Sequence, residues 1–239
     1  MADLQQALRD LVIANHILAN EKVLDGYGHV SIRHPERADR FFLGRSRSAE
    51  LVELEDIMEF DLNANPIEHK DWVMHVERYI HAAAYLARPE VNCVVHNHAY
   101  EVIPFTITNT PMRPAAVFAG CIGCSVPVWD IRKNFGDTNM MVSNMAQGND
   151  LAKTLADNRA ALLRGHGAVV TGRSVKEGVL ASIYLMVNAR IQSEAMRFGE
   201  VTYLSDGEIA LAAEVMRDSL GTNRVWEYLA QRAEARRPV

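Results

Sequence analysis

Apolar residues recur at helical spacing near the start of the chain and over most of its last third. Leu4, Leu8 and Leu11 fall on one side of a helix over residues 3–24. In the last third, two Ser-x-x-Glu sequences are typical of capping boxes, which satisfy the first free N–H groups of a helix. The predicted helices are residues 3–24, 70–88, a short one within 100–109, 144–158, 174–199, 205–221 and 222–236.

Shorter runs alternate between apolar and polar residues or are rich in β-branched side chains, as strands are. Residues 29–34 alternate and are ended by Pro35, and residues 91–95 form a β-branched run typical of a buried strand. Residues 115–132 contain Gly120 and Gly123, which favour short strands joined by turns. The predicted strands are 29–34, 40–43, 57–62, 91–95, short strands within 115–132, 160–163 and 168–170.

Strands and helices are interleaved along the chain, without a repeat, a linker or a low-complexity segment. This pattern predicts a single α/β domain over residues 1–239, in which helices cover a sheet. The helices that start at about residue 174 belong to the same domain.

The composition excludes several classes of protein. The 239 residues are 49% hydrophobic and 23% charged, as in globular proteins, and a net charge of -5 without a long basic run argues against a nucleic-acid partner. No apolar run approaches the roughly 20 residues that span a bilayer. Asp3, Arg9 and Asp10 interrupt the apolar N-terminus, which argues against a signal peptide. With three cysteines, an odd number, we expect a reducing compartment, the cytoplasm.

Two histidines follow the valine-rich strand at 91–95. Side chains alternate across a strand, so His96 and His98 are expected on the same face of the sheet. Two imidazoles on one face can bind one metal ion, but ordinary polar residues at a strand end would show the same spacing. His166 stands between Gly165 and Gly167 at a predicted strand-to-strand turn and is either a third metal ligand or a hydrogen-bonded core histidine.

Glu77 lies in the predicted helix just before the histidine strand. A crossover from this helix can bring the carboxylate over the strand end, where it would contact the metal and transfer protons. The alternative is a surface glutamate in a helix that also carries Asp71 and Arg78. Three histidine ligands with an open fourth position would indicate a catalytic metal site.

Several motifs together resemble the class II aldolase/adducin family. The resemblance runs from about residue 5 to about residue 200, and the motifs keep the family's order and approximate spacing. They are Gly26–Arg33, Leu54–Ile57, Glu77 with His81, Arg88–Pro89, Val94–His98 and Leu163–Gly167.

This resemblance implies a mixed sheet between helix layers and a cyclic homotetramer with active sites between subunits. Carried over by position, His96, His98 and His166 would hold one divalent metal, and Glu77 would be the acid/base. The all-imidazole ligand set suits Zn²⁺, and Mn²⁺ is the other candidate.

The chain departs from the sugar-phosphate aldolases of the family at three places. His29 replaces a usual asparagine, and His75 with Val76 replaces a usual serine pair. The phosphate-binding loop is replaced by Gly44–Ser48, in which Arg45 and Arg47 flank Ser46. Arginine grips planar carboxylates bidentately, so we expect this loop to bind substrate, although solvated surface charges are the alternative.

At these positions the chain is similar to the decarboxylase branch of the family, as it is at Gly28–Ser31 and Val126–Ile131. The branch implies a metal-dependent decarboxylase acting on a hydroxylated aromatic or pyridine dicarboxylate, such as dihydroxyphthalate. After loss of carbon dioxide the ring carbon needs a proton, from Glu77 or His29. The alternatives are a sugar-phosphate aldolase or epimerase and a non-catalytic, adducin-like interaction domain.

Overall fold

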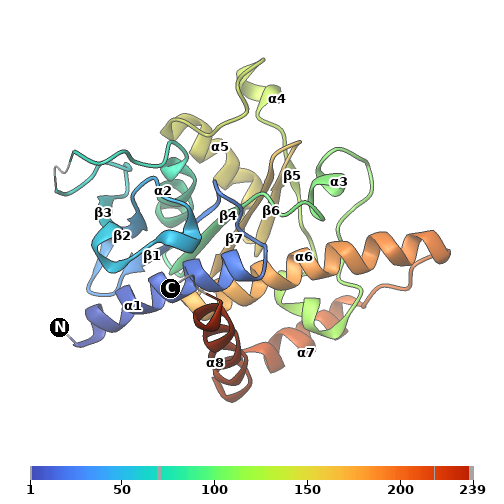
Figure 1. The fold of residues 1–239 in the computed structure, drawn as a ribbon. Coiled ribbons are helices and arrows are strands. Elements are labelled where there is room, and N and C mark those ends of the chain that lie inside the picture. The colour runs from blue at the N-terminus through green and yellow to red at the C-terminus, as the bar shows by residue number, and fades with distance from the viewer. Residues whose placement is uncertain (1, 69–70, 218, 237–239) are drawn as a thin grey trace.

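The predicted strands pair into one seven-stranded sheet (Figure 1). The computed structural model describes residues 2–68, 71–217 and 219–236. The strands are β1 (His29–His34), β2 (Arg37–Gly44), β3 (Ile57–Asp61), β4 (Cys93–Asn97), β5 (Val128–Trp129), β6 (Ala160–Leu163) and β7 (Gly167–Gly172). Their order is β3-β2-β1-β4-β7-β6-β5, and neighbours are antiparallel except for the parallel pair β5 and β6. The expected mixed sheet is therefore confirmed.

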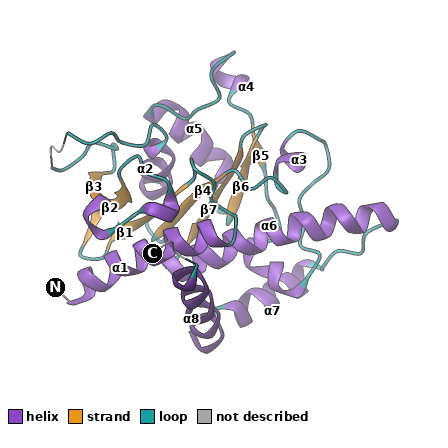
Figure 2. Cartoon of the chain, in the orientation of Figure 1, coloured by secondary structure: helices purple, strands orange, loops and turns teal. Residues whose placement is uncertain are grey.

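Helices cover both faces of this sheet (Figure 2). The α-helices are α1 (Ala2–Asn20), α2 (Arg78–Ala87), α3 (Ile103–Thr106), α4 (Arg132–Phe135), α5 (Met145–Leu155), α6 (Val175–Phe198), α7 (Asp206–Met216) and α8 (Ser219–Ala235). The 3-10 helices are η1 (Ala49–Leu51), η2 (Leu54–Asp56) and η3 (Val117–Ile122). No helix in the described ranges is both long and apolar enough to cross a membrane.

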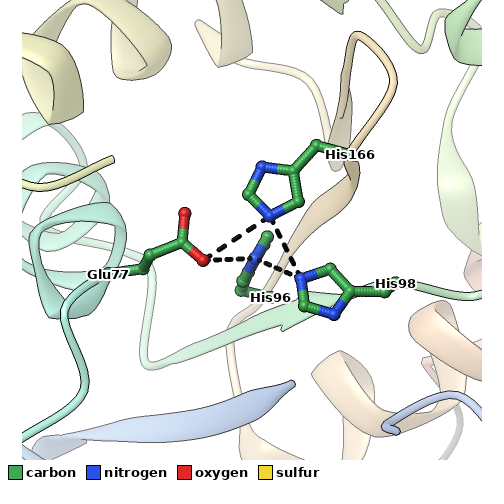
Figure 3. A group of neighbouring side chains, drawn as sticks. All are labelled: Glu77, His96, His98 and His166. Carbon is green, nitrogen blue, oxygen red and sulfur yellow. Dashed lines mark hydrogen bonds and ion pairs between the residues drawn. The ribbon is translucent and has the colours of Figure 1, made fainter. Parts of the chain in front are cut away.

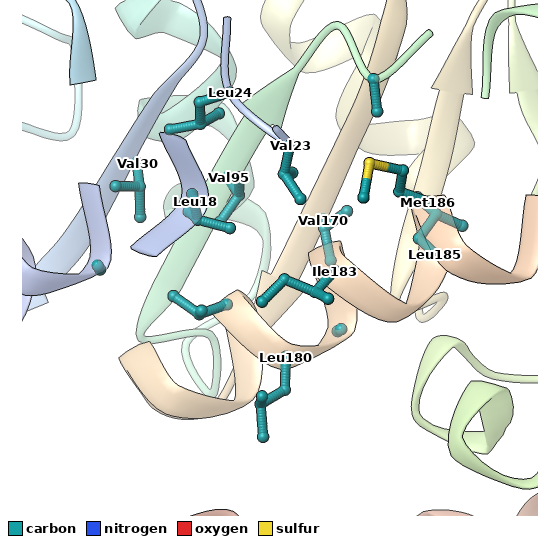
Figure 4. Close-up of a cluster of buried hydrophobic side chains, with 14 of the residues drawn as sticks. Leu18, Val23, Leu24, Val30, Val95, Val170, Leu180, Ile183, Leu185 and Met186 are labelled. Carbon is teal, nitrogen blue, oxygen red and sulfur yellow. The ribbon is translucent and has the colours of Figure 1, made fainter. Parts of the chain in front are cut away.

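Alternate residues of the central strand β4 pack into two different cores. Val95 points to a cluster that includes Leu18 of α1 and Ile183 of α6 (Figure 4). Val94, the preceding residue, belongs to a second cluster with Tyr85 of α2 and Leu151 of α5. β4 is thus buried on both sides, which confirms a buried strand with layers of helices on either face. The strand begins at Cys93 rather than at residue 91, and Asn92 before it is exposed.

Two predicted helices are shorter than their hydrophobic pattern suggests. The first ends at Asn20 rather than at residue 24, because the chain turns at Lys22, whose φ is 62°. The second was predicted from Lys70, which lies outside the described residues. Residues 71–77 are not helical, and α2 begins only at Arg78. The segment instead runs beside the loop at 44–48, where the Ser46 N–H donates to the Val73 carbonyl at 2.7 Å.

The prediction of short strands at 115–132 was largely wrong. Only β5 is a strand there, and residues 117–122 form the 3-10 helix η3. Packing against α7 explains the difference, because a Cβ on Gly120 would come within 2.7 Å of the Ala212 Cβ. The glycine permits a close helix contact here rather than a turn between strands.

The C-terminal capping pattern is confirmed in part. Ser205 and Glu208 form a complete capping box at the start of α7. At α6, Ser174 accepts from the Glu177 N–H, but the Glu177 carboxylate accepts from the Arg173 N–H, so only half of the predicted box forms. Gly221 does not end α7 as predicted. It lies within α8, and a Cβ there would meet nothing within 4 Å, so the glycine occupies an open helix position.

Candidate metal centre

Three separate parts of the fold bring four polar side chains together at one end of the sheet (Figure 3). His96 lies in β4, and His98 follows that strand. His166 lies in the turn between β6 and β7, which reaches the same end because β7 pairs antiparallel with β4. Glu77 is the residue that precedes the first turn of α2. We call Glu77, His96, His98 and His166 the histidine cluster.

The donor atoms of the histidine cluster face one another, all within 4.8 Å. The Nε2 atom of His98 lies 3.1 Å from Nε2 of both His96 and His166. The Glu77 Oε2 atom lies 3.2 Å from His96 Nε2 and 3.5 Å from His166 Nε2. Imidazole nitrogens and a carboxylate are ligands of Zn²⁺ and other divalent transition metals, so this donor set fits one such ion.

The far side of two rings is held by the protein, which orients Nε2 toward the centre. His96 Nδ1 donates to the Ala168 carbonyl at 3.2 Å. His98 Nδ1 lies 3.1 and 3.2 Å from the two carboxylate oxygens of Asp25. A histidine that donates through Nδ1 keeps the lone pair of Nε2 free for a metal. His166 Nδ1 is buried and has no hydrogen-bond partner among the described residues.

Asp25 is a site residue that sequence reasoning missed. Its carboxylate also accepts from the N–H groups of Tyr27 and Gly28, both at 2.9 Å, so it shapes the turn that precedes β1. The sequence shows Asp25 only as part of a glycine-rich break after a helix. Its contact with His98 spans 73 residues, and no local pattern reports it.

The Glu77 carboxylate is buried, and its two oxygens have different partners. Oε1 accepts from the Val142 N–H at 3.0 Å, while Oε2 faces the histidines. Burial alone raises the pKa of Glu77, but His96 and His166 outweigh burial and hold the pKa well below its usual range. Glu77 is therefore a buried carboxylate whose Oε2 atom is directed at the histidines, and it is not the surface residue of the alternative interpretation.

Steric constraints explain why a glycine stands on each side of His166. Gly165 adopts a φ of 62°, a conformation that favours glycine. A Cβ on Gly167 would lie 2.0 Å from the Asn97 carbonyl oxygen, so a side chain there would displace the strand end that carries His98. The Thr106 hydroxyl accepts from the Gly165 N–H at 2.9 Å and fixes the turn further.

His29 lies next to the histidine cluster but outside it. Its residue partner in the β1–β4 pairing is His96, and the two ring centroids are 5.2 Å apart. Burial, followed by the neighbouring His75 and His81, lowers the pKa of His29 well below 6.5. The His75 ring is tilted by 46° against the His29 ring, with the centroids 4.4 Å apart, and burial followed by His96 lowers the pKa of His75 to about 4.

The structure brings Arg45 and Arg47 together on one carboxylate. Arg45 Nε donates to Asp56 Oδ1 at 2.6 Å, and Arg47 Nη1 donates to Asp56 Oδ2 at 2.9 Å. Ser46, between them, is exposed. The loop adjoins the histidines through His75, whose ring hydrogen-bonds to the Arg45 main chain. We call residues 44–48 the arginine loop, and substrate binding by it stays a prediction.

Known proteins resemble this chain in sequence and in fold. "Decarboxylase tropJ" of Talaromyces stipitatus is 34% identical over 84% of this chain and 80% of its own length. "3,4-Dihydroxyphthalate decarboxylase" of Arthrobacter keyseri is 25% identical over 94% of this chain and 93% of its own. The solved structure of L-fuculose 1-phosphate aldolase from Glaciozyma antarctica shares the fold, with a TM-score of 0.77, 20% identity and coverage of 98% and 90%.

The family assignment rests on most of the chain. Residues 9–193 match the family described as Class II Aldolase and Adducin N-terminal domain. The match includes all four residues of the histidine cluster. Decarboxylases and aldolases are both lyases, and the relatives carry these activities in their names. The chain therefore belongs to the class II aldolase and adducin family and is a lyase.

Proposed function

We propose that the protein is a metal-dependent, non-oxidative decarboxylase of a hydroxylated aromatic or pyridine dicarboxylate. His96, His98 and His166 would hold one Zn²⁺ or Mn²⁺ per subunit, with Glu77 beside it. The observation that carries the proposal is the convergence of three Nε2 atoms and one carboxylate oxygen within 4.8 Å. The names of the relatives favour decarboxylation within this family.

The accessibility of the cluster supports a catalytic rather than a structural metal. The His98 and His166 side chains keep 16% and 14% of their surface exposed, whereas His96 is fully buried. A substrate can approach from the side of His98 and His166. The exposed Tyr27 ring lies 6.4 Å from the His98 ring and would offer a face to an aromatic substrate.

The chemistry requires charge stabilisation and one proton. A divalent metal would supply Lewis acidity, which stabilises negative charge on oxygen. Glu77 accepts the proton of the ring hydroxyl as the substrate binds. The bond between the ring and the carboxylate then breaks, its electron pair stays on the ring, and carbon dioxide leaves. The ring carbon takes a proton from Glu77 or His29, and the released phenolate is protonated by water.

The arginine loop would bind the carboxylate that lies away from the metal. Asp56 is almost completely buried and orients both guanidinium groups, but Arg45 and Arg47 keep 36% and 34% of their side-chain surface exposed. Their outer N–H groups can bind a second carboxylate. The Ser46 hydroxyl lies on the exposed side of the same loop and would add a hydrogen bond.

We further propose that the protein acts as a cyclic homotetramer on a small-molecule substrate in the cytoplasm. The tetramer and the small-molecule substrate follow from the family resemblance, and the cytoplasmic location follows from the odd number of cysteines. Tyr100, two residues after His98, is 76% exposed, and a neighbouring subunit would cover it. Light scattering of the purified protein distinguishes a tetramer of a 26.7 kDa chain from smaller assemblies.

The experiment is an assay of carbon dioxide release from hydroxylated ortho-dicarboxylates, including 3,4-dihydroxyphthalate. Protein stripped with a chelator and reloaded with Zn²⁺ or Mn²⁺ serves as the internal control. Fuculose 1-phosphate is assayed in parallel, because cleavage of the sugar phosphate would favour the aldolase alternative. Metal-restored carbon dioxide release supports the proposal. Absence of both activities in protein with a full metal complement would favour a non-catalytic role.

A further inference from the structure

Four buried side chains lie in series between β1 and α2. His29 Nδ1 is 2.7 Å from His81 Nε2, and His81 Nδ1 is 2.6 Å from the Ser31 hydroxyl. The Ser31 hydroxyl is in turn 2.8 Å from the Tyr85 hydroxyl. None of the four residues is more than 4% exposed. We call Tyr85, Ser31 and His81 the relay, because each is hydrogen-bonded to the next and the last to His29.

The relay has a direction, because each short contact holds one hydrogen. Ser31 is the one side-chain acceptor within reach of the Tyr85 hydroxyl hydrogen among the described residues. A buried hydroxyl hydrogen without an acceptor is costly, so Tyr85 donates to Ser31. The single Ser31 hydrogen then goes to His81 Nδ1.

The direction of the relay fixes the tautomer of the last ring. With its Nδ1 accepting, His81 carries its hydrogen on Nε2 and donates it to His29 Nδ1. His29 therefore carries its own hydrogen on Nε2, which makes no hydrogen bond with the described residues. The His29 ring lies beside His96, yet it contributes no atom to the histidine cluster. His29 thus carries, on a ring beside His96, a donor that no group of the described residues uses.

We propose that the relay locks His29 as a hydrogen-bond donor, and that its Nε2–H binds an anionic oxygen of the substrate rather than delivering the proton to the ring carbon. This inference rests on the proposed decarboxylase function. A proton that left Nε2 would have to be replaced along the relay from Tyr85. The resulting phenolate would lie in the core, where burial raises the pKa of Tyr85 well above 10.0. Proton return is thereby assigned to Glu77, with the relay residues as positioning residues.

The tautomer can be tested without any substrate. Solid-state ¹⁵N NMR of zinc-loaded protein labelled at its histidine ring nitrogens separates a protonated from an unprotonated nitrogen, and His29→Gln identifies the His29 signals. We expect a protonated Nε2 and an unprotonated, hydrogen-bonded Nδ1. The opposite tautomer, with the hydrogen on Nδ1, would overturn the relay.

Kinetics separate the donation of a hydrogen bond from the delivery of a proton. Glutamine keeps an N–H donor near the position of Nε2 but cannot transfer a proton as imidazole does. We expect His29→Gln to keep kcat within about tenfold of wild type, whereas Glu77→Gln loses roughly 10²–10⁴-fold. His29→Ala should lose roughly ten- to a hundredfold in kcat/KM. If His29→Gln is as damaging as Glu77→Gln, His29 is the proton donor and the proposal is wrong.

A relay variant and a matched serine variant complete the test. Ser31→Ala should abolish the single tautomer of His29 and lower kcat/KM severalfold at an unchanged metal content. Ser182→Ala removes another buried serine, whose hydroxyl donates to the Gly178 carbonyl. This variant should change neither the tautomer of His29 nor kcat/KM. An unaltered His29 spectrum in Ser31→Ala contradicts the relay. If the protein shows the expected tautomer but decarboxylates no dicarboxylate, the proposed function is refuted and the relay is not.

Discussion

The histidine cluster and the arginine loop both gather polar side chains near one end of the sheet, but they differ in what satisfies those side chains. In the cluster, acceptor atoms face one another, and the protein holds only the far sides of two rings. In the loop, two guanidinium groups share the buried Asp56 carboxylate. Groups that the protein leaves facing one another need an external ligand, whereas groups that it pairs internally have a structural role first.

This difference orders the expected effects of mutation. Loss of a cluster residue should remove the ligand and the reaction together. Loss of a loop arginine should weaken substrate binding and also disturb the loop, since Asp56 then loses a partner.

The largest effect is expected for the metal itself. Wild-type protein should hold about one equivalent of Zn²⁺ or Mn²⁺, because the cluster offers the ligands of one site. His96→Ala should lose the metal and all measurable activity, whereas His34→Gln, at a histidine outside the cluster, should keep both. Elemental analysis after reloading measures the content. Less than about a tenth of an equivalent in reloaded wild type would contradict a metal site.

The second prediction concerns Glu77, which joins the cluster through oxygen rather than nitrogen. Glu77→Gln preserves the shape and the hydrogen bond from the Val142 N–H but removes proton transfer, so kcat should fall roughly 10²–10⁴-fold. Metal content should stay close to that of wild type. A variant that keeps near-wild-type kcat on a proven substrate would show that Glu77 only shapes the site.

The sequence predicted the cluster better than its surroundings, for a physical reason. The spacing of His96 and His98 reports their common face directly, because a strand has a period of two. Asp25 and the relay depend on which strand lies beside which, and β1 pairs with β4 across more than 60 residues of chain. The helical pattern also predicted that Glu77 lies inside a helix. In the structure the Val73 carbonyl accepts a hydrogen bond from the arginine loop, and α2 begins only at Arg78.

The same limit applies to the fold as a whole. Strands with strict alternation, such as 29–34, were predicted with the correct bounds. The run at 115–132 was not, because its apolar residues and glycines serve a close contact with α7 that the local pattern does not report. Elements whose start and end are marked by their own residues can be predicted, and those shaped by contact with a distant element cannot.

The third prediction addresses the arginine loop as a binding site. Removing one bidentate contact to a carboxylate should cost about 1.5–3 kcal/mol, or roughly 10–150-fold in kcat/KM. Arg45→Ala and Arg47→Ala should show this loss on an aromatic dicarboxylate, and the lysine variants should recover only part of it. The thermal unfolding of each variant is the control for a disturbed loop. Sugar-phosphate cleavage by wild type that is insensitive to both arginines would overturn the decarboxylase assignment.

The fourth prediction tests the hydrogen bond that Asp25 makes to Nδ1 of His98, on the side of the ring away from the metal. Asp25→Asn removes the charge that orients His98 and should weaken metal affinity roughly 10–100-fold, as loss of a carboxylate partner of a metal-bound histidine does. A competition titration with a chromogenic chelator measures the affinity independently of activity. Asp137→Asn, at an exposed aspartate that is not part of the cluster, should match wild type. Equal affinity in both variants would limit Asp25 to shaping the turn before β1.

The smallest effect is expected for Asp56, the carboxylate that distinguishes the loop from the cluster. Burial raises its pKa, but the hydrogen bonds from Arg45, the Glu53 N–H and Arg47 outweigh burial and hold the pKa below 3.8. The folded state therefore binds the Asp56 proton less tightly than the unfolded state does. Its stabilising contribution is complete above about pH 4 and is lost as the pH falls through the lowered pKa.

Urea unfolding of wild type and Asp56→Asn at several pH values measures that contribution. At pH 7 wild type should be the more stable of the two, and the difference in midpoint should narrow as the pH falls below 3.8. The exposed parts of both arginines and solvent screening keep the difference modest. If the difference in midpoint stays constant from pH 7 into the acid range, the charge of Asp56 does not contribute to stability. Asp56 would then hold the loop through hydrogen bonds, which asparagine can replace in part.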